Sequence, residues 1–225
     1  MKGSLEAVIF DMDGVIIDSE PLHFQVDLDV LRGLNVNLVQ HDLEQYVGMT
    51  NPEMWKLLKE RHGITESIEE LIDIQLGQKL TTLKKSDYEP IDGIPELLAA
   101  LSEAEIKLAL ASSSPVRFID AVLDKFGIAP SFMHRISGEE MERGKPAPDI
   151  FLKAAELLNV APAGCVVIED SRNGVAAAKA AGMSCIGYRN VNSGEQDLSK
   201  ADIVVDSIRD ITAELLEQIV SRSSR

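Results

Sequence analysis

Residues 8–23 read VIFDMDGVIIDSEPLH, a short apolar run that leads directly into three carboxylates, Asp11, Asp13 and Asp18. A short apolar run bounded by polar residues predicts a buried strand. Alternate residues of an extended segment point the same way, so we expect Asp11 and Asp13 to face one site while Met12 turns away. Carboxylates this close raise one another's pKa unless a cation or a reaction favours their ionised form. The stretch therefore predicts a strand end that carries chemistry.

Five further apolar runs follow along the chain and are separated by segments with helical patterns. They occupy residues 106–111, 134–137, 165–169, 185–188 and 203–205. Strands that alternate with helices are typical of a parallel sheet. Helix starts are indicated by Pro115 after Ser114, by Pro148, and by Ser207 ahead of an apolar stripe. We predict an α/β fold with a doubly wound, Rossmann-like parallel sheet.

The first and second predicted strands are separated by about 95 residues, far more than an ordinary crossover between parallel strands contains. This interval reads as helix throughout, with helices predicted over 20–32, 43–47, 51–62 and 67–85. It therefore predicts an inserted α-helical cap domain, residues 16–89. The α/β core domain is predicted from residues 1–15 and 90–225.

The bulk composition is that of an ordinary globular protein, with 45% apolar and 26% charged residues among 225. A net charge of −15 offers no basic surface for nucleic acid or anionic membranes. No signal-peptide pattern or membrane-length apolar run is present. Cys165 and Cys185 lack metal-ligand spacing and are expected to be buried thiols. We expect a cytoplasmic protein, a monomer or weak dimer, with a small-molecule partner.

Polar residues follow the first four predicted strands. Open parallel sheets bind ligands beyond the carboxyl ends of their strands, so these residues are expected to meet at one edge. They are Asp11 and Asp13 after the first strand, Ser112, Ser113 and Ser114 after the second, Lys145 in the segment after the third, and Glu169 and Asp170 after the fourth.

Four stretches, FDMDGVIIDS, LALASSS, GKPAPDIF and VVIEDSRNG, occur in this order along the chain. They resemble the four motifs of the haloacid dehalogenase superfamily, in its β-phosphoglucomutase-like branch with a helical cap. The resemblance covers essentially the whole chain. It implies that Asp11 attacks phosphorus and forms an aspartyl-phosphate, and that Asp13 acts as general acid and base.

The carboxylates at this edge require a hard cation if an anionic phosphate is to bind. Mg²⁺ fits, because it binds through a few carboxylates, substrate oxygens and retained waters. The candidate ligands are Asp11, the main-chain carbonyl of Asp13, Asp170 and Glu169. Glu169 either binds the metal directly or contacts the residues that bind it. Lys145, held extended by the following proline, is expected to bridge the phosphoryl group and Asp11.

The three consecutive serines are expected to differ in role. Ser112, at the strand end, is the predicted phosphate-binding hydroxyl, and Ser113 is a second substrate-binding candidate. Ser114 precedes Pro115, and capping of the next helix accounts for it.

The cap contributes further candidates by resemblance. Ser19 and His23 fall where they would reach the substrate's leaving group, although a half-exposed helical histidine explains His23 equally well. Met49 and Thr50 belong to the cap loop VGMT and are candidates for substrate specificity. Asn51 is accounted for by helix capping.

The resemblance implies a Mg²⁺-dependent phosphatase that acts on a small phosphorylated metabolite such as a sugar phosphate. The closest alternative is a β-phosphoglucomutase, which returns the phosphate to the sugar and needs a second anion site in its cap. The mutases that this chain resembles place an arginine where it has Asn51 and a lysine near Ile74. Lys79, Lys84 and Lys85 either compensate or lie on a solvated face. We therefore predict that water is the final phosphoryl acceptor.

Three other classes fit less well. A dehalogenase needs neither Asp13 nor a metal. A phosphoacceptor module of the response-regulator type carries its aspartate after the third strand, where HRISGEE supplies only glutamates. A non-catalytic binding protein is conceivable on this fold, since fold alone does not fix function, but the complete set of motif residues counts against it.

Overall fold

The computed structural model describes residues 4–223, and their centre is a parallel sheet of six strands in the order β3-β2-β1-β4-β5-β6. The strands are Ala7–Phe10 (β1), Lys107–Ser112 (β2), His134–Ser137 (β3), Cys165–Glu169 (β4), Ser184–Tyr188 (β5) and Ile203–Val205 (β6). The chain runs from β1 outward to β2 and β3, then crosses to β4 on the other side of β1. Strand order therefore reverses between β1 and β4, where ligands bind in sheets of this type. The predicted doubly wound α/β fold is confirmed.

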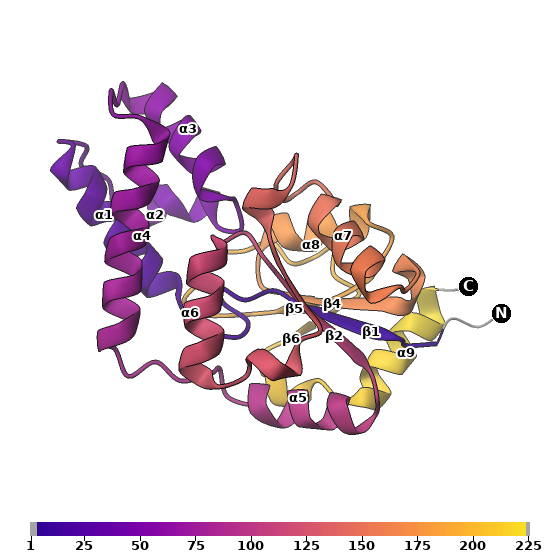
Figure 1. The fold of residues 1–225 in the computed structure, drawn as a ribbon. Helices are drawn as coiled ribbons and strands as arrows, with labels where there is room; N and C mark the ends of the chain where they lie inside the picture. Colours follow the sequence, from indigo (N-terminus) through magenta and orange to yellow (C-terminus); the bar gives the residue numbers. More distant parts are fainter. Residues whose placement is uncertain (1–3, 224–225) are drawn as a thin grey trace.

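Helices cover both faces of this sheet (Figure 1). One face carries α7 (Asp149–Leu158) and α8 (Arg172–Ala180), and the other carries α5 (Ile94–Glu103), α6 (Val116–Phe126) and α9 (Ala213–Ser223). Alternate residues of β1 enter the two layers: Ala7 and Ile9 pack with the first group, Val8 and Phe10 with the second. Burial on both faces explains why β1 reads as a continuous apolar run.

Four helices between β1 and β2 stand together beside the sheet (Figure 1). They are α1 (Glu20–Gly33), α2 (Gln40–Leu43), α3 (Asn51–His62) and α4 (Ile68–Lys85). We refer to residues 16–89 as the helical insertion. Helix α4 packs along α1 and α3 and also contacts α6 of the sheet layer. Trp55 is fully buried within the insertion.

Short 3-10 helices complete the described chain: Glu44–Tyr46 (η1), Ala129–Ser131 (η2), Gly138–Glu140 (η3), Pro162–Gly164 (η4) and Ile208–Asp210 (η5). The last of these corrects the predicted start of the final helix. The Ser207 hydroxyl accepts from the Arg209 N–H and caps η5, while the Thr212 hydroxyl accepts from the Leu215 N–H near the start of α9. Within the described chain, no helix combines the length and apolar character that crossing a membrane requires.

Candidate active site

The residues that follow β1, β2, β3 and β4 meet at one edge of the sheet. Asp11 follows β1, Ser112 is the last residue of β2, and Asp170 follows β4. Lys145 reaches the same place from the loop between β3 and α7. All four side chains are buried. Ionisable groups are therefore concentrated in a region with little access to water.

Lys145 is the cation at the centre of this edge. Its Nζ donates to Oδ1 of Asp11 and to Oε1 of Glu169, both at 2.7 Å, and to the carbonyl of Ala111 at 3.4 Å. The ring of Phe151 lies 5.1 Å from Nζ. Burial would lower the pKa of Lys145, but the two carboxylates raise it above its ordinary value. Lys145 therefore stays protonated, with its three N–H donors engaged.

Glu169 holds Lys145 from the side opposite Asp11. Its Oε2 accepts hydrogen bonds from the main-chain N–H groups of Asp170 and Ser171 and from the Ser171 hydroxyl, each at 2.9 Å. A Cβ at position 174 would lie 1.7 Å from Oε1, so glycine is needed there for the carboxylate to reach the start of α8. Both carboxylate oxygens of Glu169 are thus already occupied by hydrogen bonds.

Asp13 is surrounded by hydrogen-bonding groups from two parts of the chain. Its Oδ1 accepts from the Ser19 hydroxyl at 2.6 Å and lies 2.7 Å from Nε2 of His23, both from the helical insertion. Its Oδ2 accepts from the hydroxyls of Ser112 at 3.0 Å and Ser114 at 2.8 Å. Burial would raise the pKa of Asp13, but these partners, His23 first, bring it below its ordinary range. Asp13 is therefore ionised at neutral pH.

Ser114 is a site residue that the sequence analysis assigned wrongly to helix capping. Helix α6 begins at Val116 with Pro115 in extended conformation at its N-cap, one position later than predicted. The Ser114 side chain is consequently free to reach Asp13. Ser113 does not contact Asp13: it borders the same pocket, and its hydroxyl donates to the carbonyl of Gly48 in the helical insertion at 2.9 Å.

Asp11, Glu169 and Asp170 each offer an oxygen within 4.8 Å of the others. Burial raises the pKa of Asp11 to about 8 against the attraction of Lys145, and burial with the charge of Glu169 raises the pKa of Asp170. A divalent cation would favour the ionised form of both aspartates. A Cβ on Gly14, whose φ is +76°, would lie 1.9 Å from Oδ2 of Asp170, so only glycine leaves this carboxylate its place. This all-oxygen donor set suits Mg²⁺.

A pocket lies between these groups and the helical insertion. The insertion residues that line it include Glu20, His23, Asp27, Met49, Asn51 and Lys79, and the sheet edge contributes Asp11, Asp13 and Asp170. Met49, a predicted specificity candidate, therefore faces the pocket.

The start of α3 differs from the prediction. Thr50, not Asn51, is the N-cap residue and has an extended backbone. Its main-chain N–H donates to Oε2 of Glu53, and its hydroxyl donates to the same oxygen at 2.7 Å. The Asn51 amide instead lies 3.4 Å from Oε1 of Glu139. The assignment of Asn51 to capping was therefore wrong, and its side chain borders the pocket.

Glu20, Asp27 and Lys79 were not predicted as site residues, although the pattern carried a signal. The buried stripe of α4 runs through Leu71, Gln75, Lys79 and Leu83, four residues apart. A lysine on a buried stripe indicates a partner or a function rather than a solvated face. The same reasoning applies to Glu20 and Asp27 on the buried face of α1.

Comparisons with known proteins identify the family of this chain. The family model of the haloacid dehalogenase-like hydrolases matches residues 5–182. The chain is 35% identical to β-phosphoglucomutase of Bacillus subtilis over 95% of both chains, and 31% identical to hexitol phosphatase B of Escherichia coli over 92% of this chain and 94% of the relative. The crystal structure of β-phosphoglucomutase from Clostridium difficile superposes with a TM-score of 0.87 at 26% identity, covering 97% and 98% of the two chains. The protein belongs to the haloacid dehalogenase-like hydrolases.

Proposed function

We propose that this protein is a Mg²⁺-dependent phosphatase that hydrolyses a small phosphorylated sugar or sugar alcohol, with water as the final phosphoryl acceptor. The observation that carries the proposal is the pairing of two aspartates at one strand end. Asp11 is held by Lys145 at 2.7 Å, and Asp13 is held by hydroxyl groups and a histidine beside the pocket. The relatives that are named for sugar phosphates support the substrate class.

In the first step, a carboxylate oxygen of Asp11 attacks phosphorus, and the bond between phosphorus and the ester oxygen breaks. Asp13 donates a proton to the departing oxygen, which leaves as an alcohol. Asp13 must carry a proton at that moment, and the negative charge of a bound phosphate raises its pKa toward protonation. The phosphoryl group is now an aspartyl-phosphate on Asp11.

In the second step, a water molecule attacks phosphorus and gives a proton to Asp13, while the bond to Asp11 breaks and phosphate is released. An ionised Asp13 is what this step needs, in line with its lowered pKa. Ser112 would bind a phosphoryl oxygen from the end of β2, and Lys145 would keep Asp11 oriented.

Mg²⁺ would be held by Asp11, Asp170 and the main-chain carbonyl of Asp13, and when bound it would offset the negative charge of these groups and of the phosphoryl oxygens. We assign Glu169 to holding Lys145 and the start of α8, since both of its oxygens already accept hydrogen bonds.

The helical insertion, residues 16–89, would act as a cap domain over the α/β core of residues 1–15 and 90–225. Three hydrogen bonds join the insertion to the core across this boundary and would hold the cap closed. Ser113 donates to Gly48, Asn173 donates to the Val47 carbonyl at 3.0 Å, and the Gly144 N–H donates to Glu53 at 3.1 Å. A closed cap would exclude water other than the attacking molecule from the site.

A β-phosphoglucomutase is the second candidate, favoured by the 35% identity with the Bacillus subtilis enzyme and by the burial of Lys79 in the pocket. Lys79, however, lies 3.5 Å from the carboxylate of Asp27, so its charge is already matched.

The two functions are separated by incubating the protein with Mg²⁺, β-glucose 1-phosphate and a trace of the bisphosphate. We expect inorganic phosphate to accumulate. Rapid conversion to glucose 6-phosphate with negligible free phosphate would identify a mutase.

A further inference from the structure

The part of the pocket wall that the helical insertion contributes contains charged residues of α1 and α4. Glu20 and Asp27 come from α1, Lys79 comes from α4, and all three are more than nine-tenths buried. Phe24 and Met54 line the same pocket and add apolar surface. Buried charged side chains are rare unless they are paired or bind a ligand.

Asp27 is held in position by a chain of hydrogen bonds from Trp55 through Gln75. The indole N–H of Trp55 donates to the Gln75 side-chain oxygen at 3.3 Å, and the Gln75 amide donates to Oδ1 of Asp27. Lys79 Nζ lies 3.5 Å from the same oxygen. This arrangement sets the position of Lys79 and leaves it N–H donors beyond the one directed at Asp27.

Glu20 has no such partner. Its side chain lines the pocket, and among the described residues no hydrogen bond to its carboxylate is present. Because this mostly buried carboxyl group reaches the pocket, a ligand bound there can supply the hydrogen bonds that it lacks.

The charges of this wall limit what that ligand can be. One cation, Lys79, stands beside Asp27 and Glu20, so the wall carries no excess positive charge. A second phosphate or a carboxylate placed here would face two buried carboxyl groups and compete with Asp27 for Lys79. Neutral hydroxyl groups meet no such penalty, because each can donate to Glu20 and accept from Lys79.

We propose that Glu20 and Lys79 form the subsite for the uncharged, hydroxyl-rich end of a sugar or sugar-alcohol monophosphate, and that the Asp27–Lys79 pair excludes substrates with a second anionic group. This inference rests on the proposed phosphatase function and assigns the residues that select its substrate. Glu20, Lys79 and Asp27 act as specificity residues and take no part in the bond-making steps at phosphorus.

The first test compares kcat/KM of the Mg²⁺-loaded wild-type protein for a hexitol 6-phosphate, a hexose 1,6-bisphosphate and 2-phosphoglycolate. We expect a preference for the hexitol monophosphate of about tenfold or more over both doubly anionic compounds. Equal or better turnover of either doubly anionic compound would overturn the inference. The artificial ester p-nitrophenyl phosphate is included as a general phosphatase substrate. If the protein releases phosphate from none of these four compounds, the phosphatase function itself is refuted.

The second test uses variants. Lys79→Met should lose about tenfold more kcat/KM for the hexitol phosphate than for p-nitrophenyl phosphate, because the aromatic ester presents no hydroxyl groups to the wall. Glu20→Gln should raise KM for the hexitol phosphate more than it lowers kcat. Asp27→Asn should increase the ratio of bisphosphate to monophosphate turnover about tenfold, since it frees the charge of Lys79. A general loss of stability cannot produce that gain.

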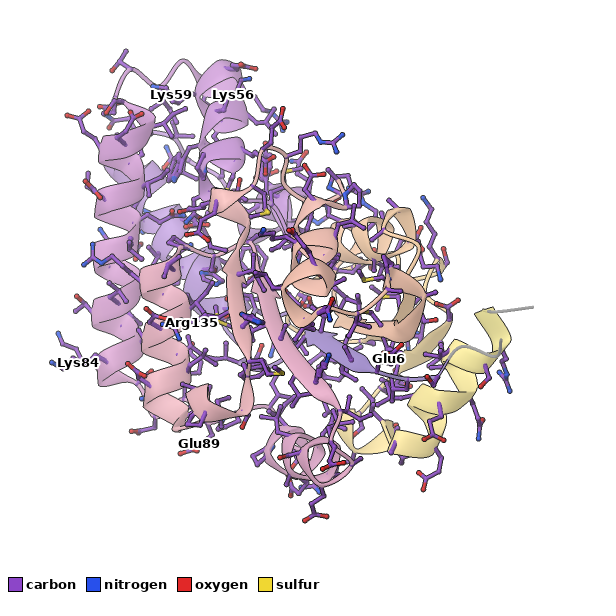
Figure 2. The ribbon with its side chains drawn as sticks, turned by 45° about the vertical axis from the view of Figure 1, so that its right-hand side comes forward. Glu6, Lys56, Lys59, Lys84, Glu89 and Arg135 are labelled. Atoms are coloured by element: carbon purple, nitrogen blue, oxygen red, sulfur yellow. The ribbon has the colours of Figure 1, made fainter. Side chains whose placement is uncertain are left out.

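The matched control is Lys84→Met on the same helix. Figure 2 shows Lys84 at the outer side of α4, pointing away from the molecule, and its side chain is exposed. This variant should keep wild-type values for all four compounds. If Lys79→Met fails to fold, the double variant Asp27→Asn/Lys79→Met removes both charges and is used instead. Unchanged substrate ratios in a folded Lys79 variant would contradict the proposed subsite.

Discussion

The ring nitrogen Nε2 of His23 lies 2.7 Å from Oδ1 of Asp13, and within the described chain the other ring nitrogen, Nδ1, is buried without a hydrogen-bond partner. His23 belongs to α1 of the helical insertion, whereas Asp13 follows β1 of the sheet. The contact therefore ties the ionisation of Asp13 to the position of the insertion. If the insertion moved away, Asp13 would lose the partner that contributes most to lowering its pKa.

We predict that His23→Ala lowers kcat by about ten- to a hundredfold and moves the acid side of the pH profile toward neutral pH. Without His23 the pKa of Asp13 rises, so the base needed for the second step is lost at a higher pH. The measurement is kcat against pH with a hexitol 6-phosphate. His41→Ala, at an exposed position on α2, is the control and should match the wild type. An unshifted acid limb in His23→Ala would exclude this role.

Lys145→Met should destabilise the protein by about 3–5 kcal/mol, because it leaves Glu169 buried without the cation that it contacts and removes the hydrogen bond to Asp11. The free energy of unfolding in urea, measured without metal, tests this. The control Lys153→Met removes a partly exposed lysine on α7 and should change stability by less than about 1 kcal/mol. A comparably small loss in Lys145→Met would mean that the buried ion pairs contribute little.

Much of the sheet edge could be predicted from the sequence because its geometry is local. Asp11, Asp13 and Asp170 directly follow strands whose apolar runs are unmistakable, and parallel strands bring their carboxyl ends to one side. The position of Lys145 could not be predicted from strand ends alone, because Lys145 lies several residues after β3. Only the sequence motif around it indicated that it belongs to the site.

The misassigned and missed residues depend on details that a sequence does not fix. Ser114 carries the same signal as a helix cap, and a shift of one residue in the start of α6 decided between capping and a bond to Asp13. Lys79 and Glu20 lie on helices of the insertion, and which face of each helix meets the pocket depends on how α1 packs along α4. The sequence pattern indicated that both residues lie on buried helix faces, but it did not indicate that they face a ligand pocket.

We predict that Mg²⁺ stabilises the protein more at about pH 8 than at about pH 6. In the metal-free fold, burial raises the pKa of Asp11 from 3.8 to about 8. The folded state therefore holds a proton that the unfolded state has lost, and this contribution to stability declines as pH rises toward 8. Mg²⁺ must displace that proton at lower pH but not at higher pH.

The measurement is Tm with and without Mg²⁺ at both pH values. Asp170→Asn should reduce the Mg²⁺-induced increase in Tm at each, because it removes a predicted ligand. An increase in Tm that is the same at both pH values would show that Asp11 does not bind the metal as an ionised carboxylate.

The role of Asp11 is decided by the rate at which inorganic phosphate is released from a hexitol 6-phosphate in the presence of Mg²⁺. We predict release by the wild-type protein and by the control Asp29→Asn, at an exposed position on α1. Asp11→Asn should fold, as judged by circular dichroism and Tm, and should lose at least about a thousandfold in rate, since an amide cannot attack phosphorus. Phosphate release near the wild-type rate by folded Asp11→Asn would contradict an aspartyl-phosphate mechanism.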